Sequence, residues 1–123
     1  MPNQKAVFVV DDDAPTLRGV KRLLRAHGFK AVLFDSAQAL RDHNHFNEAF
    51  CMILDINLAK ESGIDLRNEL AAAGVSLPVI YITGNDNQAT RMAALESGCI
   101  AYLTKPFAAK SLIEPIELVA GPA

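Results

Sequence analysis

The stretch Val7–Leu17, VFVVDDDAPTL, joins four apolar residues directly to three aspartates, followed by an alanine and a proline. An unbroken apolar run of this kind is typical of a strand that is buried on both faces of a parallel sheet. Pro15 stands where a helix could begin, because proline is favoured in the first turn of a helix. The stretch therefore predicts a buried strand that leads through an acidic turn into a helix.

The alternation of a short apolar run with a longer segment of helical period recurs along the whole chain. Short apolar and β-branched runs predict strands, and several of the intervening segments end at a glycine, which commonly stops a helix. The predicted strands are Ala6–Val10, Ala31–Phe34, Cys51–Ile56, Pro78–Thr83 and Ala101–Thr104.

A helix is predicted after each of these strands, with an apolar face turned toward the sheet. Ser36 can cap the second helix, in which Phe46 is expected to point inward together with Ala37 and Leu40. In chain order, the helices are expected from Leu17 to Gly28, from Ser36 to Phe46, over Ile64–Ala73, over Gln88–Ser97, and through Leu112, Ile116 and Val119.

Regular strand–helix alternation predicts an α/β fold with one doubly wound, five-stranded parallel sheet, because parallel strands need crossover helices that cover both faces. Strands one, three and four are continuously apolar, so we expect them to be buried on both faces. A length of 123 residues with 50% hydrophobic and 21% charged residues is typical of one packed domain. We expect a three-layer α/β/α domain over residues 1–123, with no output domain in this chain.

Composition argues against several classes of function. A net charge of −2 does not provide the basic surface that nucleic-acid binding requires, so direct nucleic-acid binding is not expected. No apolar run reaches the roughly 20 residues of a membrane span and the N-terminus has no cationic leader, which predicts a cytoplasmic protein without membrane contact. Cys51 and Cys99 are interpreted as small buried hydrophobes, because no His or Cys at metal-ligand spacing accompanies them.

Polar residues of types that take part in catalysis and metal binding lie where the predicted strands end. Three aspartates, residues 11–13, follow the first strand; Asp55 lies at the end of the third, Thr83 ends the fourth, and Lys105 follows the fifth. The carboxyl ends of parallel strands share one edge of the sheet, where open α/β proteins bind their ligands. We therefore expect these side chains to meet.

Carboxylates gathered at one edge repel one another. Two unit charges about 5 Å apart at an effective dielectric near 20 repel by roughly 3 kcal/mol, so the cluster either raises its pKa values or binds a cation. Hard oxygen ligands favour Mg²⁺, which commonly completes its coordination with a phosphate oxygen. A metal, the Lys105 cation, the Thr83 hydroxyl and a nucleophilic carboxylate are together the parts of a phosphoryl-transfer site.

Four motifs, VVDDDAP, ILDINLAKESG, YITG and YLTKPF, occur in this order over essentially the whole chain, and together they resemble the receiver domain of bacterial two-component response regulators. The resemblance implies a flavodoxin-like sheet of order 2-1-3-4-5. It also implies a domain that takes a phosphoryl group from a sensor histidine kinase or a histidine phosphotransfer protein. Because the family often dimerises, homodimerisation on phosphorylation is one option that the resemblance leaves open. The resemblance implies only self-catalysed phosphorylation and slow autodephosphorylation as catalytic activity.

The same resemblance assigns the acceptor and the metal ligands. Asp55 matches the phosphoacceptor aspartate. Asp11 and Asp12 match the acidic pair that holds Mg²⁺, with Mn²⁺ as the alternative ion, and Asp55 completes the carboxylate ligands. The backbone carbonyl of Asn57 matches the remaining protein ligand.

The last two motifs supply the expected phosphoryl-binding and switch residues. Lys105 matches the lysine that pairs with the phosphoryl group, and its bond to Pro106 matches one that is cis in the family. Thr83 and Gly84 are expected to bind phosphoryl oxygens. Thr83 and Tyr102 match a switch pair that alters the face formed by the fourth helix, the fifth strand and the fifth helix.

Simpler structural roles compete with these assignments. Asp13, just before Ala14 and Pro15, is interpreted as the cap of the first helix, where a carboxylate also favours the helix dipole. Asp11 and Asp12 could be solvated loop charges, and Tyr102 could be an ordinary half-buried strand residue.

Two departures from the family pattern affect the expectations for the loop after Asp55 and for the last helix. Ala59 stands where the family usually has a proline, which predicts a looser loop. Pro115 lies inside the last helical segment and predicts a fifth helix that is kinked, short or late to start.

Two other functions compete with the switch. A haloacid-dehalogenase-like phosphohydrolase also places an aspartate nucleophile after an apolar first strand, but its D-x-D-x-T/V run does not fit, because Pro15 is fifth from Asp11 and Ala14 is third from Asp12. A receiver-like interaction module without phosphorylation is the other alternative. We rank it lower because every expected site residue is present.

Overall fold

The computed structural model describes residues 5–121, so the first four and last two residues of the expected domain lie outside the described residues. Its strands are β1 (Ala6–Val10), β2 (Ala31–Phe34), β3 (Ala49–Asp55), β4 (Val79–Thr83) and β5 (Ala101–Thr104). Its α-helices are α1 (Ala14–Ala26), α2 (Ala37–His43), α3 (Gly63–Ala72), α4 (Gln88–Ser97) and α5 (Ala109–Ala120), and a 3₁₀ turn, η1, covers Phe46–Glu48.

The strands form one parallel sheet in the order β2-β1-β3-β4-β5, which confirms the expected topology. Every residue of β1 and β4 is buried, and β3 is buried except for the half-buried Phe50. The edge strands β2 and β5 are only partly covered. The continuously apolar runs therefore occupy the three central positions, where both faces of a strand are covered.

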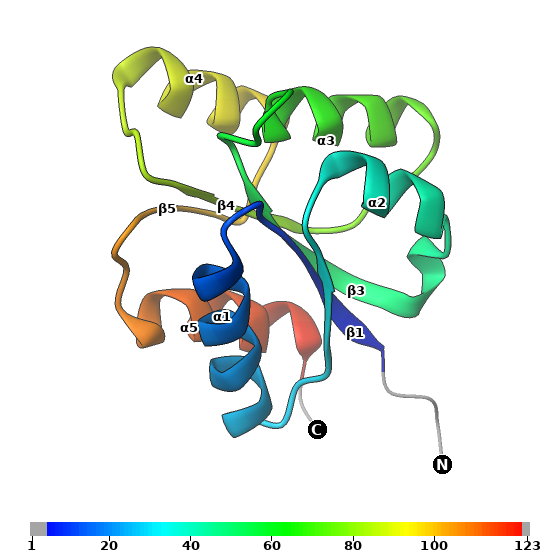
Figure 1. Ribbon diagram of the computed structural model, residues 1–123, viewed down its shortest axis with the longest axis vertical. Helices are drawn as coiled ribbons and strands as arrows, with labels where there is room; N and C mark the ends of the chain where they lie inside the picture. The colour runs from blue at the N-terminus through cyan, green and yellow to red at the C-terminus, as the bar shows by residue number, and fades with distance from the viewer. Residues whose placement is uncertain (1–4, 122–123) are drawn as a thin grey trace.

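Helices cover both faces of the sheet, as Figure 1 shows: α1 and α5 lie on one side, and α2, α3 and α4 on the other. Because successive strand residues point to opposite faces, the central strands supply side chains to two separate cores. The core under α1 and α5 includes Val9, Leu24, Ile53, Leu112 and Ile116. The core under the other three helices includes Phe8, Leu40, Leu54, Leu66 and Leu70. Within residues 5–121, no helix is long and apolar enough to cross a bilayer.

The second helix is shorter than its sequence pattern predicts. Ser36 accepts the expected capping hydrogen bond, 3.0 Å from the amide nitrogen of Ala39. The helix ends at His43, because Asn44 adopts the left-handed conformation with φ 54°. The expectation that Phe46 belongs to this helix is wrong: the residue lies in η1, from which it still packs against the core.

Pro115 does not shorten the last helix, which runs unbroken over 12 residues. Leu112, Ile113 and Ile116 surround the proline in sequence and are buried against the sheet. Their packing outweighs the loss of one backbone donor at Pro115. The remaining differences are small: β3 begins at Ala49 rather than Cys51.

Candidate functional site

The polar residues predicted at the strand ends do meet at one edge of the sheet. Asp11 directly follows β1, Asp55 ends β3, Thr83 ends β4, and Lys105 directly follows β5. The parallel register sets the last residues of neighbouring strands at nearly the same level. Three of the four are polar groups buried in the protein, with exposures of 0% for Asp11, 3% for Asp55 and 0% for Thr83.

Lys105 bridges the two buried carboxylates. Its Nζ donates to Oδ2 of Asp11 and to Oδ2 of Asp55, at 2.9 Å each. Burial raises the pKa of Asp11 above its ordinary value, although the Asp13 amide and Lys105 act in the opposite direction. Burial also opposes the charge on Lys105, but the two carboxylates outweigh it and raise the pKa of the ammonium group. The lysine therefore stays charged and partly neutralises the acidic site.

Backbone amides orient the other oxygen of each carboxylate. The amide of Asp13 donates to Oδ1 of Asp11, and the amide of Asn57 donates to Oδ1 of Asp55, both at 2.8 Å. Each aspartate thus closes a local turn with the residue two positions later. Both side chains are held in place before any ligand arrives.

The three aspartates of the first motif have different positions. Asp12 is exposed but offers a carboxylate oxygen that lies within 4.8 Å of oxygens from Asp11 and Asp55. Asp13 instead caps α1, because its carboxylate accepts from the Thr16 amide at 3.0 Å and from the Thr16 hydroxyl at 2.5 Å. Those bonds lower the pKa of Asp13. The cluster of Asp11, Asp12 and Asp55 is a set of hard oxygen donors that fits a divalent cation such as Mg²⁺.

Thr83 connects this cluster to the next loop. Its hydroxyl donates to Oδ1 of Asn57 at 2.6 Å and accepts from the amide of Asn85 at 3.0 Å. Gly84 follows Thr83 at an exposed bend directly after β4. The Lys105–Pro106 peptide bond is cis.

Tyr102 lies on β5, and its hydroxyl contacts the loop before α4. It donates to Oδ1 of Asp86 at 2.9 Å, while the Arg91 guanidinium lies 5.0 Å from the centre of its ring. Arg91 also donates to Oδ2 of Asp86 at 2.7 Å. Burial and the acceptor Asp86 raise the pKa of Tyr102. Sequence reasoning missed Asp86 and Arg91, whose only signal was an opposite-charge pair at the start of a predicted helix.

Gly63 is a third residue whose role sequence reasoning missed. A Cβ atom there would lie 2.2 Å from the backbone oxygen of Asp55. The start of α3 therefore packs directly on the backbone of the candidate acceptor, and only glycine fits. The loop from Ile56 to Ser62 is closed at its base by a bridge between Asn57 and Ser62 and by the Gly63 amide, which donates to the Ile56 carbonyl at 2.9 Å.

Residues 7–117 match the family model described as the response regulator receiver domain. Nodulation protein W of Bradyrhizobium diazoefficiens is 33% identical over 110 residues, which cover 89% of this chain and 48% of that protein. Response regulator protein TmoT of Ectopseudomonas mendocina is 31% identical, covering 92% of this chain and 51% of that protein. The chain thus spans about half the length of these curated relatives.

A solved structure agrees with the sequence matches. The crystal structure of a response regulator receiver domain protein from Clostridium thermocellum superposes with a TM-score of 0.84 at 27% identity. The match covers 94% of this chain and 93% of that one. The similarity therefore extends over the whole sheet and its helices.

Proposed function

This chain belongs to the response regulator receiver domain family, and from that membership we propose that it is a phosphorylation switch with Asp55 as the phosphoacceptor. The observation that supports the proposal most directly is the bridge made by Lys105, which holds Asp55 and Asp11 at 2.9 Å each. A buried carboxylate within an acidic cluster, in contact with a lysine ammonium group, has the parts that phosphoryl transfer needs.

The residues that would hold a metal are Asp11, Asp12, Asp55 and the backbone carbonyl of Asn57, with Mg²⁺ as the preferred ion and Mn²⁺ as the alternative. Such an ion would neutralise charge on the transferring phosphoryl group. Asp11 and Asp55 are oriented by backbone amides, so little ordering would be needed on binding. Asp12 is exposed and would join them from the turn.

In the proposed reaction, a carboxylate oxygen of Asp55 attacks the phosphorus of a phosphohistidine, and the phosphorus–nitrogen bond breaks as the new phosphorus–oxygen bond forms. Lys105 already contacts Asp55 and would move its contact to a phosphoryl oxygen, where a charge-assisted hydrogen bond is strong. Thr83 and Gly84 would donate to the remaining oxygens. This chemistry makes the domain a signalling module with only self-catalysed turnover.

The switch would act through Thr83 and Tyr102. For Thr83 to reach a phosphoryl group, its hydroxyl must leave Asn57. For Tyr102 to turn inward, its hydroxyl must leave Asp86 and its ring must leave Arg91. Moving such an equilibrium from 1:99 to 99:1 takes about 5.5 kcal/mol of differential stabilisation, which several charge-assisted bonds to one phosphoryl group can supply.

We further propose, from the family membership, which proteins donate the phosphoryl group to this domain and which face of it transmits the signal. A sensor histidine kinase or histidine phosphotransfer protein would donate the phosphoryl group in the cytoplasm. The face formed by α4, β5 and α5 would report the change to a partner, to an output domain, or to a second copy of the chain. The receiver itself would span residues 1–123.

Intact-mass measurement after incubation with Mg²⁺ and acetyl phosphate, and separately with a phosphorylated histidine kinase, tests the acceptor. The wild-type chain and an Asp42→Asn control should each gain the mass of one phosphoryl group. Asp55→Asn should gain none. An equal gain in Asp55→Asn would reject Asp55 as the acceptor. No gain in the wild-type chain from either donor would favour the interaction module, and steady hydrolysis of diverse phosphomonoesters would favour a phosphohydrolase.

A further inference from the structure

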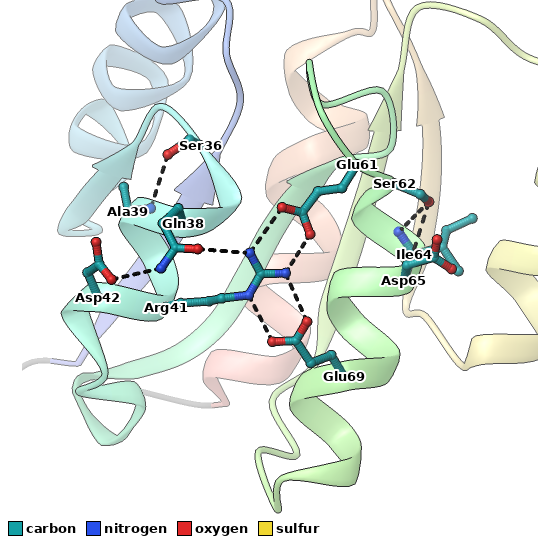
Figure 2. Close-up of polar contacts among 10 residues, drawn as sticks. All are labelled: Ser36, Gln38, Ala39, Arg41, Asp42, Glu61, Ser62, Ile64, Asp65 and Glu69. Carbon is teal, nitrogen blue, oxygen red and sulfur yellow. Dashed lines mark hydrogen bonds and ion pairs between the residues drawn. The ribbon is translucent and has the colours of Figure 1, made fainter.

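Arg41 of α2 lies between two glutamates that belong to different parts of the chain, as Figure 2 shows. Its Nε and Nη2 atoms donate to the two carboxylate oxygens of Glu69 in α3, at 2.8 Å each. Its Nη1 and Nη2 atoms donate to the two oxygens of Glu61 at 3.0 and 2.5 Å. Both contacts are bidentate, the geometry in which arginine binds carboxylates most strongly and most specifically.

The two glutamates differ in what they hold. Glu69 lies within α3, so its contact with Arg41 joins two helices. Glu61 lies in the loop that follows Asp55, directly before Ser62, which caps α3 through its hydroxyl. Ser62 in turn pairs with Asn57 across the base of the loop. Arg41 therefore binds the loop at Glu61, one residue before Ser62, where the loop pairs with Asn57.

The ion pair between Arg41 and Glu61 is partly shielded from solvent. The Arg41 side chain is 25% exposed and that of Glu61 is 31% exposed. Hydrogen bonds from Arg41 lower the pKa of Glu61 and of Glu69, so both remain ionised at neutral pH. An isolated exposed ion pair adds little to stability. A bidentate arginine that binds two carboxylates forms a charge network, which is the kind of ion pair that does add stability.

We propose that Arg41 is a positioning residue for the phosphoacceptor site, acting through Glu61 to hold the loop that carries Asn57. The inference deepens the proposed function and rests on it. Asn57 touches Asp55 through its amide and Thr83 through its side chain, so the position of this loop sets the geometry of both. The loop contains no proline to stiffen it, and an external clamp would reduce the ordering cost of binding a metal and a phosphoryl group.

Amide hydrogen exchange in the metal-free protein tests the clamp independently of phosphorylation. Glu61→Gln should speed exchange of the Asn57 and Gly63 amides by roughly three- to tenfold relative to the core amide of Val9. The matched variant Glu69→Gln removes the charge and one acceptor oxygen from the other contact of the same arginine but leaves the loop contact. The Asn57 and Gly63 amides of this variant should therefore exchange within about twofold of wild type. Equal exchange in Glu61→Gln and wild type would overturn the proposal, as would equal acceleration in both variants.

A Mg²⁺ titration followed by NMR supplies the second readout. Glu61→Gln and Arg41→Met should raise the Kd for Mg²⁺ by roughly two- to tenfold and slow labelling by acetyl phosphate, while Glu69→Gln keeps the wild-type Kd. Unchanged Kd values in Glu61→Gln would overturn the proposal even if Arg41→Met fails to fold. Failure of the proposed function is distinct, because it would appear as a wild-type chain that gains no phosphoryl group.

Discussion

The hydroxyl of Thr83 donates a 2.6 Å hydrogen bond to the side-chain oxygen of Asn57, although 26 residues separate them in the chain. This bond occupies the donor that the proposed switch would redirect to a phosphoryl oxygen. It therefore stabilises the resting arrangement, and the loop after Asp55 and the end of β4 are coupled through it. Changes on either side of the bond should alter the balance between the resting and phosphorylated states.

Asn57→Ala should favour the phosphorylated arrangement. The variant removes an acceptor that Thr83 uses only in the resting state, and one hydrogen bond contributes about 0.5–1.5 kcal/mol. Binding of beryllofluoride, a phosphoryl mimic, should therefore tighten roughly two- to tenfold in saturating Mg²⁺. An NMR titration measures it, with the exposed Asn47→Ala as control. Unchanged or weaker binding would show that the Thr83–Asn57 bond does not oppose the switch.

Asp86→Ala should release Tyr102. Asp86 accepts from the Tyr102 hydroxyl and from Arg91, whose guanidinium lies over the ring. Loss of Asp86 removes the hydroxyl contact directly and also removes the ion pair that positions Arg91 over the ring. Beryllofluoride binding should again tighten, roughly two- to tenfold. Asp42→Ala, which removes an exposed carboxylate on α2, is the control. If Tyr102 side-chain resonances and beryllofluoride affinity both match wild type, the ring is not held by this contact.

Gly63→Ala and Gly19→Ala should have opposite effects on stability. A Cβ at Gly63 would meet the Asp55 backbone oxygen at 2.2 Å, whereas nothing lies within 4 Å of one at Gly19, inside α1. Forcing a methyl group into packed backbone costs about 1–3 kcal/mol, and replacing a helical glycine by alanine contributes about 1 kcal/mol. Urea unfolding should therefore show a lower midpoint for the first variant and a higher one for the second. A Gly63→Ala midpoint at or above wild type would contradict the close approach.

Stability should fall at alkaline pH partly through Cys51. Burial raises the pKa of this thiol from 9.0 to about 12. Because the pKa is higher in the folded state, the buried neutral thiol favours folding. This contribution to stability is complete below pH 9 and is lost as the pH rises from 9 toward 12. Cys51→Val, of similar size, should show a shallower fall in Tm over that range.

Thiol labelling gives a direct check of the same burial. At pH 8, iodoacetamide should modify the half-buried Cys99 before Cys51, and Cys51 should react only after unfolding in urea. Native-state labelling of Cys51 at the rate of Cys99, or an unchanged pH dependence of Tm in Cys51→Val, would contradict the burial argument.

Local sequence patterns predicted much of the fold because they depend on contacts within one element. The strands Ala6–Val10, Ala31–Phe34 and Ala101–Thr104 and the helix Gln88–Ser97 have the bounds that the sequence indicates. Continuous apolar runs identified the central strands. The end of α2 was missed, because the left-handed turn at Asn44 interrupts a pattern that apolar spacing alone would extend to Phe46.

Part of the site was also predictable, since strand ends of a parallel sheet must share an edge. That rule was enough to expect Asp11, Asp55, Thr83 and Lys105 at one place. It could not distinguish the roles of three consecutive aspartates beyond the capping tendency of Asp13.

The sequence alone determined that this chain forms a parallel α/β domain with an acidic edge, because periodicity, caps and strand ends are local properties. Only the tertiary structure decided which long side chains meet around that edge. Arg41 reaches glutamates 20 and 28 residues away, and Tyr102 reaches Asp86 across 16 residues. Such side chains have many rotamers of similar energy, and the packing of neighbouring helices and loops selects among them.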